Sequence, residues 1–126
     1  MEQTLPRGWA ASTLGALSEY ITSGSRDWSS YYAATGSLFI RTQDINKNRI
    51  GDLDSVARVS LPSSVEGKRS LVLQDDLLIT ITGANVGRCA RVAAQLPEAY
   101  VSQSVVLVRL QMPSLARFVH YQLLAP

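Results

Sequence analysis

The feature that most constrains this chain is the stretch 71–92, which reads LVLQDDLLITITGANVGRCARV and predicts two strands joined by a turn. Leu77, Ile79 and Ile81 fall on one face of a strand at period two, and the residues between them fall on the other face. Many of these residues are β-branched and favour a pleated, half-buried surface. A second strand is expected over residues 88–92.

The turn between these strands is rich in glycine. Gly83 and Gly87 flank Asn85, a composition typical of a loop that needs positive φ or the close approach of another backbone. Arg88 follows directly, so the loop is a candidate for meeting a polar partner. The alternative is an ordinary hairpin with a solvated tip, and periodicity alone favours that alternative.

Composition bounds the fold class and says little about function. The 126 residues, 46% of them hydrophobic, suffice for one domain with a real core. The net charge of +2 says little about possible partners. The basic residues are more informative, because ten are Arg and two are Lys. Arg binds guanine edges and phosphates in a bidentate way, although a GC-rich genome produces the same bias. Cys89 is the one cysteine, so it is expected to pack as a small apolar residue in a reducing cytoplasm. No apolar run approaches the roughly 20 residues of a membrane span.

Periodicity and turn residues predict the remaining elements. Residues 1–8 are expected to form a loose lead-in and residues 9–126 a single domain. The expected elements are a helical turn over 12–17, strands over 18–22, 38–41, 57–61 and 104–110, and an amphipathic helix over 115–124. The strand over 104–110 contains a continuous apolar run, as expected for burial on both faces. Ser63 and Glu66 resemble a capping box, which predicts a short helix ending near Gly67.

The segment 23–36, SGSRDWSSYYAATG, is the most aromatic and polar loop. Arg26 and Trp28 lie among serines, with two tyrosines nearby. Such residues stack on bases and pair with phosphate. In the alternative reading, the aromatic side chains fold inward as a lid over the sheet edge. Both readings carry equal weight here.

A second polar segment, TQDINKNR over residues 42–49, offers the side chains used for base-edge readout. Gln and Asn suit adenine, Arg suits guanine, and Asp accepts from the cytosine amino group. Polar loops often contain such residues, and Asp44 equally suits an Asx-type turn. Lys68 and Arg69 are interpreted either as solvated surface or as phosphate contacts.

Sequence motifs for catalysis are absent. GANVGR matches neither a dinucleotide-binding nor a phosphate-binding loop, and the chain has no G-x-S-x-G. His120 is a lone histidine and a poor metal candidate. Asp75 and Asp76 are interpreted as an exposed turn rather than a nuclease metal site. The sequence therefore predicts a binding protein without catalytic residues, cofactor or metal.

Several motifs in order resemble one family, the target recognition domain of the DNA specificity (S) subunit of type I restriction–modification systems. Residues 38–45, LFIRTQDI, are similar to the family's F-I-R-x-x-D-I. Residues 76–87, DLLITITGANVG, are similar to its G-D-L-L-I-T-x-T-G-x-x-x-G, with Asp75 in place of the first Gly. The resemblance extends over residues 8–124 and includes Trp9, Gly24 and the segment 100–103.

The resemblance implies an α+β fold, a twisted and mainly antiparallel sheet with a few short helices at its side. It also implies a non-catalytic, cytoplasmic component of host defence that reads one half of a bipartite double-stranded DNA target. Methyltransferase and restriction subunits are the implied partners, with DNA methylation and cleavage on those subunits. An S subunit typically carries two such domains and long helices, so this chain is expected to stop before the conserved long helix.

The residue predictions follow from this reading. Candidates for base or groove contacts are Arg26, Trp28, Arg41, Gln43, Asn46, Asn48, Asn85 and Gln103. Candidates for phosphate contacts are Lys47, Arg49, Lys68, Arg69 and Arg88, and Gly83 and Gly87 are expected to shape their loop. The alternative function is a protein-interaction module that docks through the apolar face of residues 115–124. An enzyme fragment ranks below both, and the sequence leaves the oligomeric state open.

Overall fold

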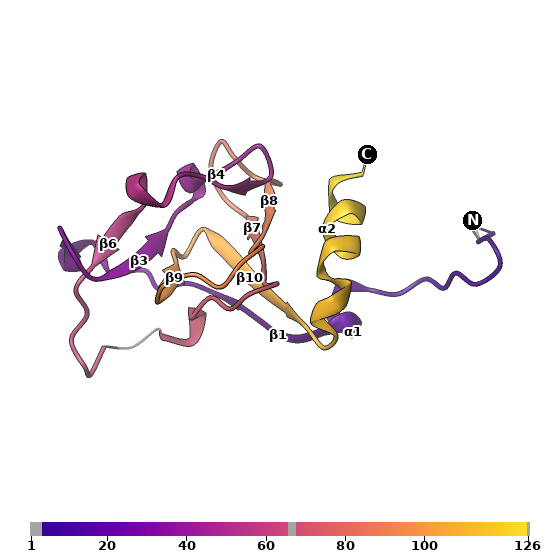
Figure 1. Ribbon diagram of the computed structural model, residues 1–126, viewed down its shortest axis with the longest axis horizontal. Helices are drawn as coiled ribbons and strands as arrows, with labels where there is room; N and C mark the ends of the chain where they lie inside the picture. The colour runs from indigo at the N-terminus through magenta and orange to yellow at the C-terminus, as the bar shows by residue number, and fades with distance from the viewer. Residues whose placement is uncertain (1–3, 66–67, 126) are drawn as a thin grey trace.

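The computed structural model describes residues 4–65 and 68–125, which form short strands, two α-helices and several 3-10 turns (Figure 1). The strands are β1 (Ser18–Ser23), β2 (Tyr32–Ala33), β3 (Ser37–Ile40), β4 (Ile45–Asn46), β5 (Arg49–Ile50), β6 (Ala57–Val59), β7 (Leu77–Thr80), β8 (Cys89–Arg91), β9 (Ala99–Val101) and β10 (Val105–Leu110). The helices are α1 (Leu14–Leu17), η1 (Ser29–Tyr31), η2 (Thr42–Asp44), η3 (Leu53–Ser55), η4 (Lys68–Ser70), η5 (Pro113–Leu115) and α2 (Ala116–Leu124). Within the described ranges, no helix is long and apolar enough to span a membrane.

The strands form two four-stranded sheets and a small ribbon. The first sheet has the order β1-β10-β7-β8 and is antiparallel throughout. The second has the order β2-β6-β3-β9, in which β3 and β9 run parallel. The α+β class with mainly antiparallel strands and a few short helices is confirmed; the strands are divided between two sheets, and β3 with β9 is a parallel pair. The long connection from β3 to β9 permits this pair, because parallel neighbours need a crossover.

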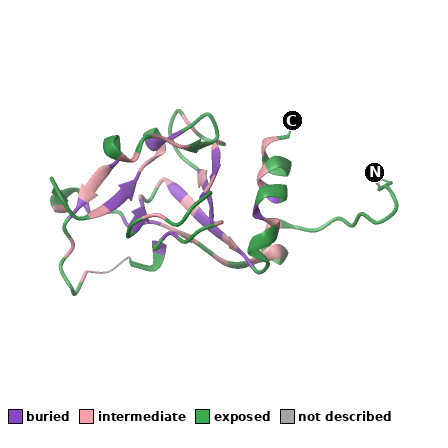
Figure 2. Ribbon diagram, viewed as in Figure 1, coloured by how far each residue is buried: buried purple, intermediate pink, exposed green. Residues whose placement is uncertain are grey.

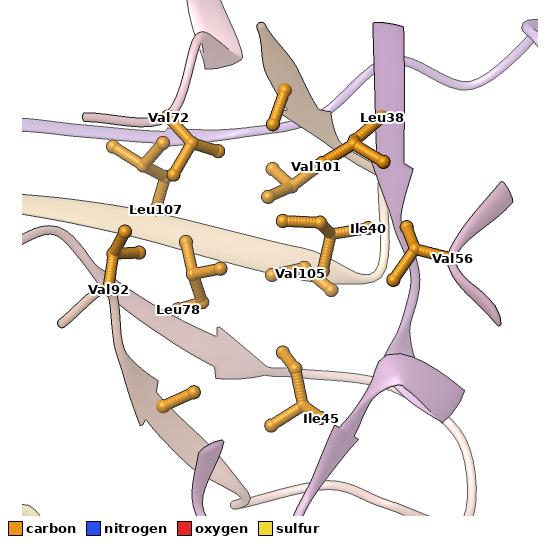
Figure 3. Close-up of a cluster of buried hydrophobic side chains, with 12 residues drawn as sticks. Leu38, Ile40, Ile45, Val56, Val72, Leu78, Val92, Val101, Val105 and Leu107 are labelled. Carbon is orange, nitrogen blue, oxygen red and sulfur yellow. The ribbon is translucent and has the colours of Figure 1, made fainter. Parts of the chain in front are cut away.

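The main core lies between the two sheets (Figure 3). Leu38 and Ile40 from β3 meet Leu78 from β7 and Val105 and Leu107 from β10, all fully buried. Because successive side chains of a strand point to opposite faces, the residues between these point away from the main core and pack in a second layer on the outer face of each sheet. The strands β7 and β10 are therefore buried on both faces, as predicted for residues 104–110.

Each sheet is covered on its outer face, and many strand segments are coloured as buried in Figure 2. Ala116 and Val119 of α2 pack on the first sheet against Leu77 and Cys89. The second sheet is covered by the segment after β1, in which Trp28 packs with residues of β3, β6 and β9. The chain thus has a layered order of helix, sheet, core, sheet and loop.

The helix over residues 115–124 differs in one respect from its predicted apolar face. Phe118 and Leu123 were expected on that face, yet they are 48% and 40% exposed. The stripe that contacts the sheet passes through Ala116 and Val119 instead. His120 is half-buried, and its Nε2 lies 2.8 Å from the carbonyl oxygen of Cys89.

The aspartate pair before β7 also departs from the prediction of an exposed turn. Asp76 is 1% exposed, because its carboxylate accepts hydrogen bonds from Arg109 and from the backbone N–H of Leu73. Asp75 is half-buried and pairs with Arg91. The predicted capping box includes Glu66, and the short helix that it predicts ends near Gly67; both residues lie outside the described part of the chain.

Candidate nucleic-acid interface

The C-terminal ends of four strands, β1, β3, β7 and β9, lie side by side at one edge of the molecule. The parallel pair β3 and β9 ends in register at Ile40 and Val101. Ser25, the second residue after β1, forms a parallel bridge with Ser102. The end of β7 joins the same edge, because Ile81 donates its N–H to the carbonyl oxygen of Ser104 at 3.0 Å. The loops that follow these four strands therefore meet, although they are far apart in the sequence.

Gly24 allows the closest of these approaches. Its N–H donates to the Ser102 carbonyl oxygen at 3.2 Å, and a Cβ at this position would lie 1.6 Å from the carbonyl oxygen of Val101. A side chain of any size is therefore excluded. This contact sets Arg26 beside Gln103, one residue beyond the bridge on each segment.

A surface groove of about 240 Å³ gathers four of the predicted base contacts. Arg26 and Gln103 line it together with Arg41 and Gln43. The Nε of Arg26 donates to Oε1 of Gln103 at 3.1 Å. No carboxylate lines this groove within the described parts of the chain. The groove therefore presents hydrogen-bonding groups and net positive charge, the properties of a surface that binds nucleic acid.

The glycine loop between β7 and β8 continues this polar surface. Arg88 donates from Nη1 to Oδ1 of Asn46 at 2.7 Å, and Asn85 Nδ2 lies 3.4 Å from the carbonyl oxygen of Thr42. Asn46 in turn donates to the carbonyl oxygen of Gln43 at 2.7 Å. The structure thus joins the polar segment 42–49 to the glycine loop, which the sequence did not predict.

The glycine loop has a fixed shape. Gly83 and Gly87 have φ values of 85° and 93°, as expected for residues that shape a turn. The hydroxyl of Thr80 donates to the carbonyl oxygen of Asn85 and accepts from the N–H of Arg88. These contacts anchor the loop to the end of β7.

Strands β4 and β5 form a tight hairpin whose tip carries Lys47 and Asn48. Both residues have positive φ, 52° and 60°, as a two-residue type I′ turn requires. Arg49 follows, and all three side chains are exposed. The hairpin therefore presents two cations and an amide beside the polar surface formed by Asn46 and Arg88.

Lys68 and Arg69 occupy a different part of the surface. In Figure 1, η4 lies on the opposite side of the view from the glycine loop between β7 and β8. Arg69 donates to the carbonyl oxygen of Gly24 and to Oγ1 of Thr22. It shares a groove of about 450 Å³ with Arg26. Arg26 therefore connects the two parts of the predicted interface.

Most cations of this surface lack an acidic partner. Among the described residues the ion pairs are Arg41–Asp44, Arg91–Asp75 and Arg109–Asp76. Arg41 is the one predicted contact in this set, and its partner Asp44 is buried. The other predicted cations form no ion pair with a described residue, which agrees with a role in phosphate binding.

Three strand residues outside the predicted contacts have a raised pKa. Burial, with a smaller contribution from Glu98, raises the pKa of Tyr100, and burial raises the pKa of Cys89 to about 11. A hydrogen bond to Asp76 raises the pKa of Arg109. Across residues 4–65 and 68–125, no group of His, Cys, Asp and Glu has the arrangement of a metal site. What this surface offers is charge and hydrogen bonding.

The structure corrects the prediction for Trp28. Its side chain is 3% exposed and packs against Phe39 and Tyr100, with ring centroids 5.5 and 5.3 Å apart. Of the two readings of the aromatic loop, the inward one holds for this residue, because the outer face of the second sheet needs an apolar cover. Tyr32, one of the two tyrosines of the aromatic loop, was not among the predicted contacts, yet it is 45% exposed and lines the groove with Arg26.

Comparisons with known proteins show which solved structures have a similar fold. No family model matches the chain, and no curated protein matches it. Among solved structures, it is similar to a chain from a study of complex assembly and conformational transition of the type I R-M system. The identity is 25% and the TM-score 0.70, over 98% of this chain and 30% of that one. It is also similar to the HsdS subunit from Thermoanaerobacter tengcongensis, with 19% identity and a TM-score of 0.63 over 96% of this chain and 30% of that chain.

These neighbours confirm the resemblance predicted from the motifs. The first belongs to a type I R-M system and the second is an HsdS subunit, and each matches nearly the whole of this chain. The fold is that of a segment of an HsdS specificity subunit. The chain spans 30% of the length of either neighbour, so the activity of the whole protein is a separate question.

Proposed function

We propose that this chain is a DNA target recognition domain of a type I restriction–modification specificity subunit, which reads one half of a bipartite target. The observation that carries the proposal is the convergence of predicted contacts from four separate segments. Arg26, Gln43, Gln103 and Arg88 follow different strands, yet they gather on one surface of a fold shared with HsdS.

The chemistry of this surface suits DNA in two ways. Side chains with paired donors and acceptors, such as Gln43 and Asn46, match the base edges of the major groove. Exposed cations, such as Lys47 and Arg49, suit phosphates on either side of the groove. The first group gives sequence choice, and the second gives affinity without choice.

The proposal assigns the chain partners rather than a reaction of its own. The methyltransferase and restriction subunits of a type I system would carry out the chemistry, and this chain would supply no catalytic group. The structural neighbour described as part of a type I R-M assembly supports such partners. A protein that reads chromosomal DNA in this way would act in the cytoplasm.

The salt dependence of binding tests this proposal. A fluorescence anisotropy titration of the chain against a short duplex, from 20 to 200 mM salt (about a tenfold range), reports the number of phosphate contacts through its slope. We expect log K to fall linearly with log salt, by about 0.9 per phosphate contact. Lys47→Gln should reduce the slope by about one contact.

Arg117→Gln is the matched control. Arg117 is also an exposed cation, but it lies on α2, where its guanidinium stacks over Tyr121. Its removal should leave the slope unchanged. Association that does not change with salt, or equal effects of the Lys47 and Arg117 variants, contradicts the proposed interface.

A second candidate function is protein docking through α2. Phe118 and Tyr121 are 48% and 59% exposed, and the ring of Trp9, 54% exposed, lies 5.8 Å from that of Phe118. Single exposed apolar residues are common, but this aromatic group is clustered. Self-association that Phe118→Asp abolishes, with no DNA binding by either form, would favour this second function over the first.

A further inference from the structure

The contact between Arg26 and Gln103 stands out within the proposed DNA surface, because both residues are exposed and yet fixed. Ser25 and Ser102, the residues directly before them, form a parallel bridge, and Gly24 is in backbone contact with Val101 and Ser102. The two side chains therefore extend from backbone that is held on both segments. Neither residue lies at a mobile loop tip.

The hydrogen bond between these side chains determines which edge of the guanidinium is available. Nε of Arg26 donates to Oε1 of Gln103 at 3.1 Å. Within the described residues, no hydrogen bond or ion pair engages Nη1 or Nη2 of Arg26. The end of the guanidinium thus keeps two parallel donors, the fork that matches two acceptors side by side.

We propose that Arg26 reads a guanine in the DNA target and that Gln103 is its positioning residue, an inference that rests on the proposed function. Among base edges in the major groove, guanine presents two acceptors, N7 and O6, to such a fork. A phosphate also accepts a fork. However, a phosphate contact needs charge rather than a fixed direction, whereas base discrimination needs the side chain held in one orientation, and Gln103 provides that restraint.

The neighbours of Arg26 support this assignment. The groove that it shares with Arg41 and Gln43 contains no carboxylate among the described residues, so nothing there would repel the acceptors of guanine. Arg41 differs from Arg26, because Asp44 lies 3.4 Å from its Nε and offsets its charge. Of the two arginines that line this groove, Arg26 is held by the uncharged side chain of Gln103 and forms no ion pair with a described residue.

The experiment is a parallel selection from a randomised duplex pool by the full chain and four variants. Arg26→Lys keeps the charge and removes the fork. Gln103→Leu removes the acceptor that holds Nε, and Gln103→Glu keeps an acceptor. Arg49→Lys is the matched control, since it makes the same change at a predicted phosphate contact.

The proposal expects a guanine at one position of the motif selected by the wild-type chain. Arg26→Lys should reduce the preference for that guanine by about 5- to 150-fold, the range expected for a bidentate contact, while the other positions keep their preferences. Gln103→Leu should weaken the preference at the same position. Gln103→Glu keeps the acceptor but offsets the charge of Arg26, so it should keep the preference for guanine while lowering affinity for all sequences. Arg49→Lys should leave all preferences unchanged.

Three kinds of failure are distinguishable. If the wild-type chain selects no motif, the proposed function itself fails. If the wild-type chain selects a motif but Arg26→Lys leaves every preference intact, or lowers affinity equally for all sequences, the guanine assignment is overturned while the proposed function stands. A Gln103→Leu variant that behaves as the wild-type chain overturns the positioning role.

Discussion

Asp76 and Asp75 are adjacent in the sequence, yet their replacement by Asn should have very different effects on stability. Asp76 is 1% exposed and binds Arg109 through both carboxylate oxygens, Oδ1 to Nε at 2.9 Å and Oδ2 to Nη2 at 2.8 Å. Oδ2 also accepts from the N–H of Leu73 at 2.8 Å. Asn at this position keeps the size of the side chain but leaves the arginine charge without its partner.

The magnitude follows from burial. Breaking a buried ion pair by removing one partner costs about 3–5 kcal/mol. The side chain of Arg109 is 22% exposed, so water recovers part of its solvation, and we expect a loss of about 3 kcal/mol for Asp76→Asn. The pair of Asp75 with Arg91 is 28% and 25% exposed, for which about 0–1 kcal/mol is expected.

Urea unfolding of the wild-type chain and the two variants measures this difference. Asp75→Asn serves as the matched control. Asp75 has a φ of 70°, and Asn tolerates this backbone conformation well, so the substitution adds no backbone strain. With an m-value of about 2 kcal/mol/M, Asp76→Asn should lower the midpoint by about 1.5 M and Asp75→Asn by less than about 0.5 M, at unchanged m. Equal losses for the two variants, or a loss below about 1 kcal/mol for Asp76→Asn, would refute this account of the buried pair.

Two further predictions concern packing. Gly24→Ala should prevent the approach of this segment to Val101 and lower the free energy of unfolding by more than about 2 kcal/mol, because the new Cβ would lie 1.6 Å from backbone oxygen. Gly15→Ala in α1 is the control, since its Cβ would meet nothing within 4 Å, and it should stabilise by about 0.5–1 kcal/mol in the same denaturation assay. Cys89, whose pKa is about 11 because of burial, should have about one thiolate in a thousand at pH 8. An alkylation time course should therefore show slow reaction of the native chain and fast reaction in denaturant, and comparable rates would contradict the buried thiol.

The hairpin of β7 and β8 illustrates what local sequence specifies. Alternation of apolar residues and two glycines with a turn composition suffice to predict strand, loop and strand. The buried run of β10 is predicted for the same reason. These patterns are local, so a single sequence reveals them. The register, in which Leu77 pairs with Arg91, is known from the structure.

The parallel pairing of β3 with β9 could not be predicted in this way. Leu38 and Ala99 are 61 positions apart, and neither segment carries a signal that names its partner. The same limit applies to Asp76, whose partner Arg109 lies 33 positions away. From sequence alone, a pair of aspartates before a strand suggests a solvated turn. Only the tertiary structure shows that Arg109 lies against Asp76.

The candidate site was predictable by residue type more than by arrangement. Polar and basic residues in loops identified Arg26, Gln103 and Arg88 as candidates, but their grouping depends on which strand ends meet. Trp28 was assigned to both the surface and the core, and composition could not separate the two. Trp28 is buried because it packs on the apolar outer face of the second sheet.

Selection of duplexes from a randomised pool by the full chain, at low and at physiological salt, tests the central claim most directly. The account predicts enrichment of one short motif, with affinity that falls steeply as salt rises. Enrichment of no motif at either salt would contradict the claim that this surface reads DNA sequence.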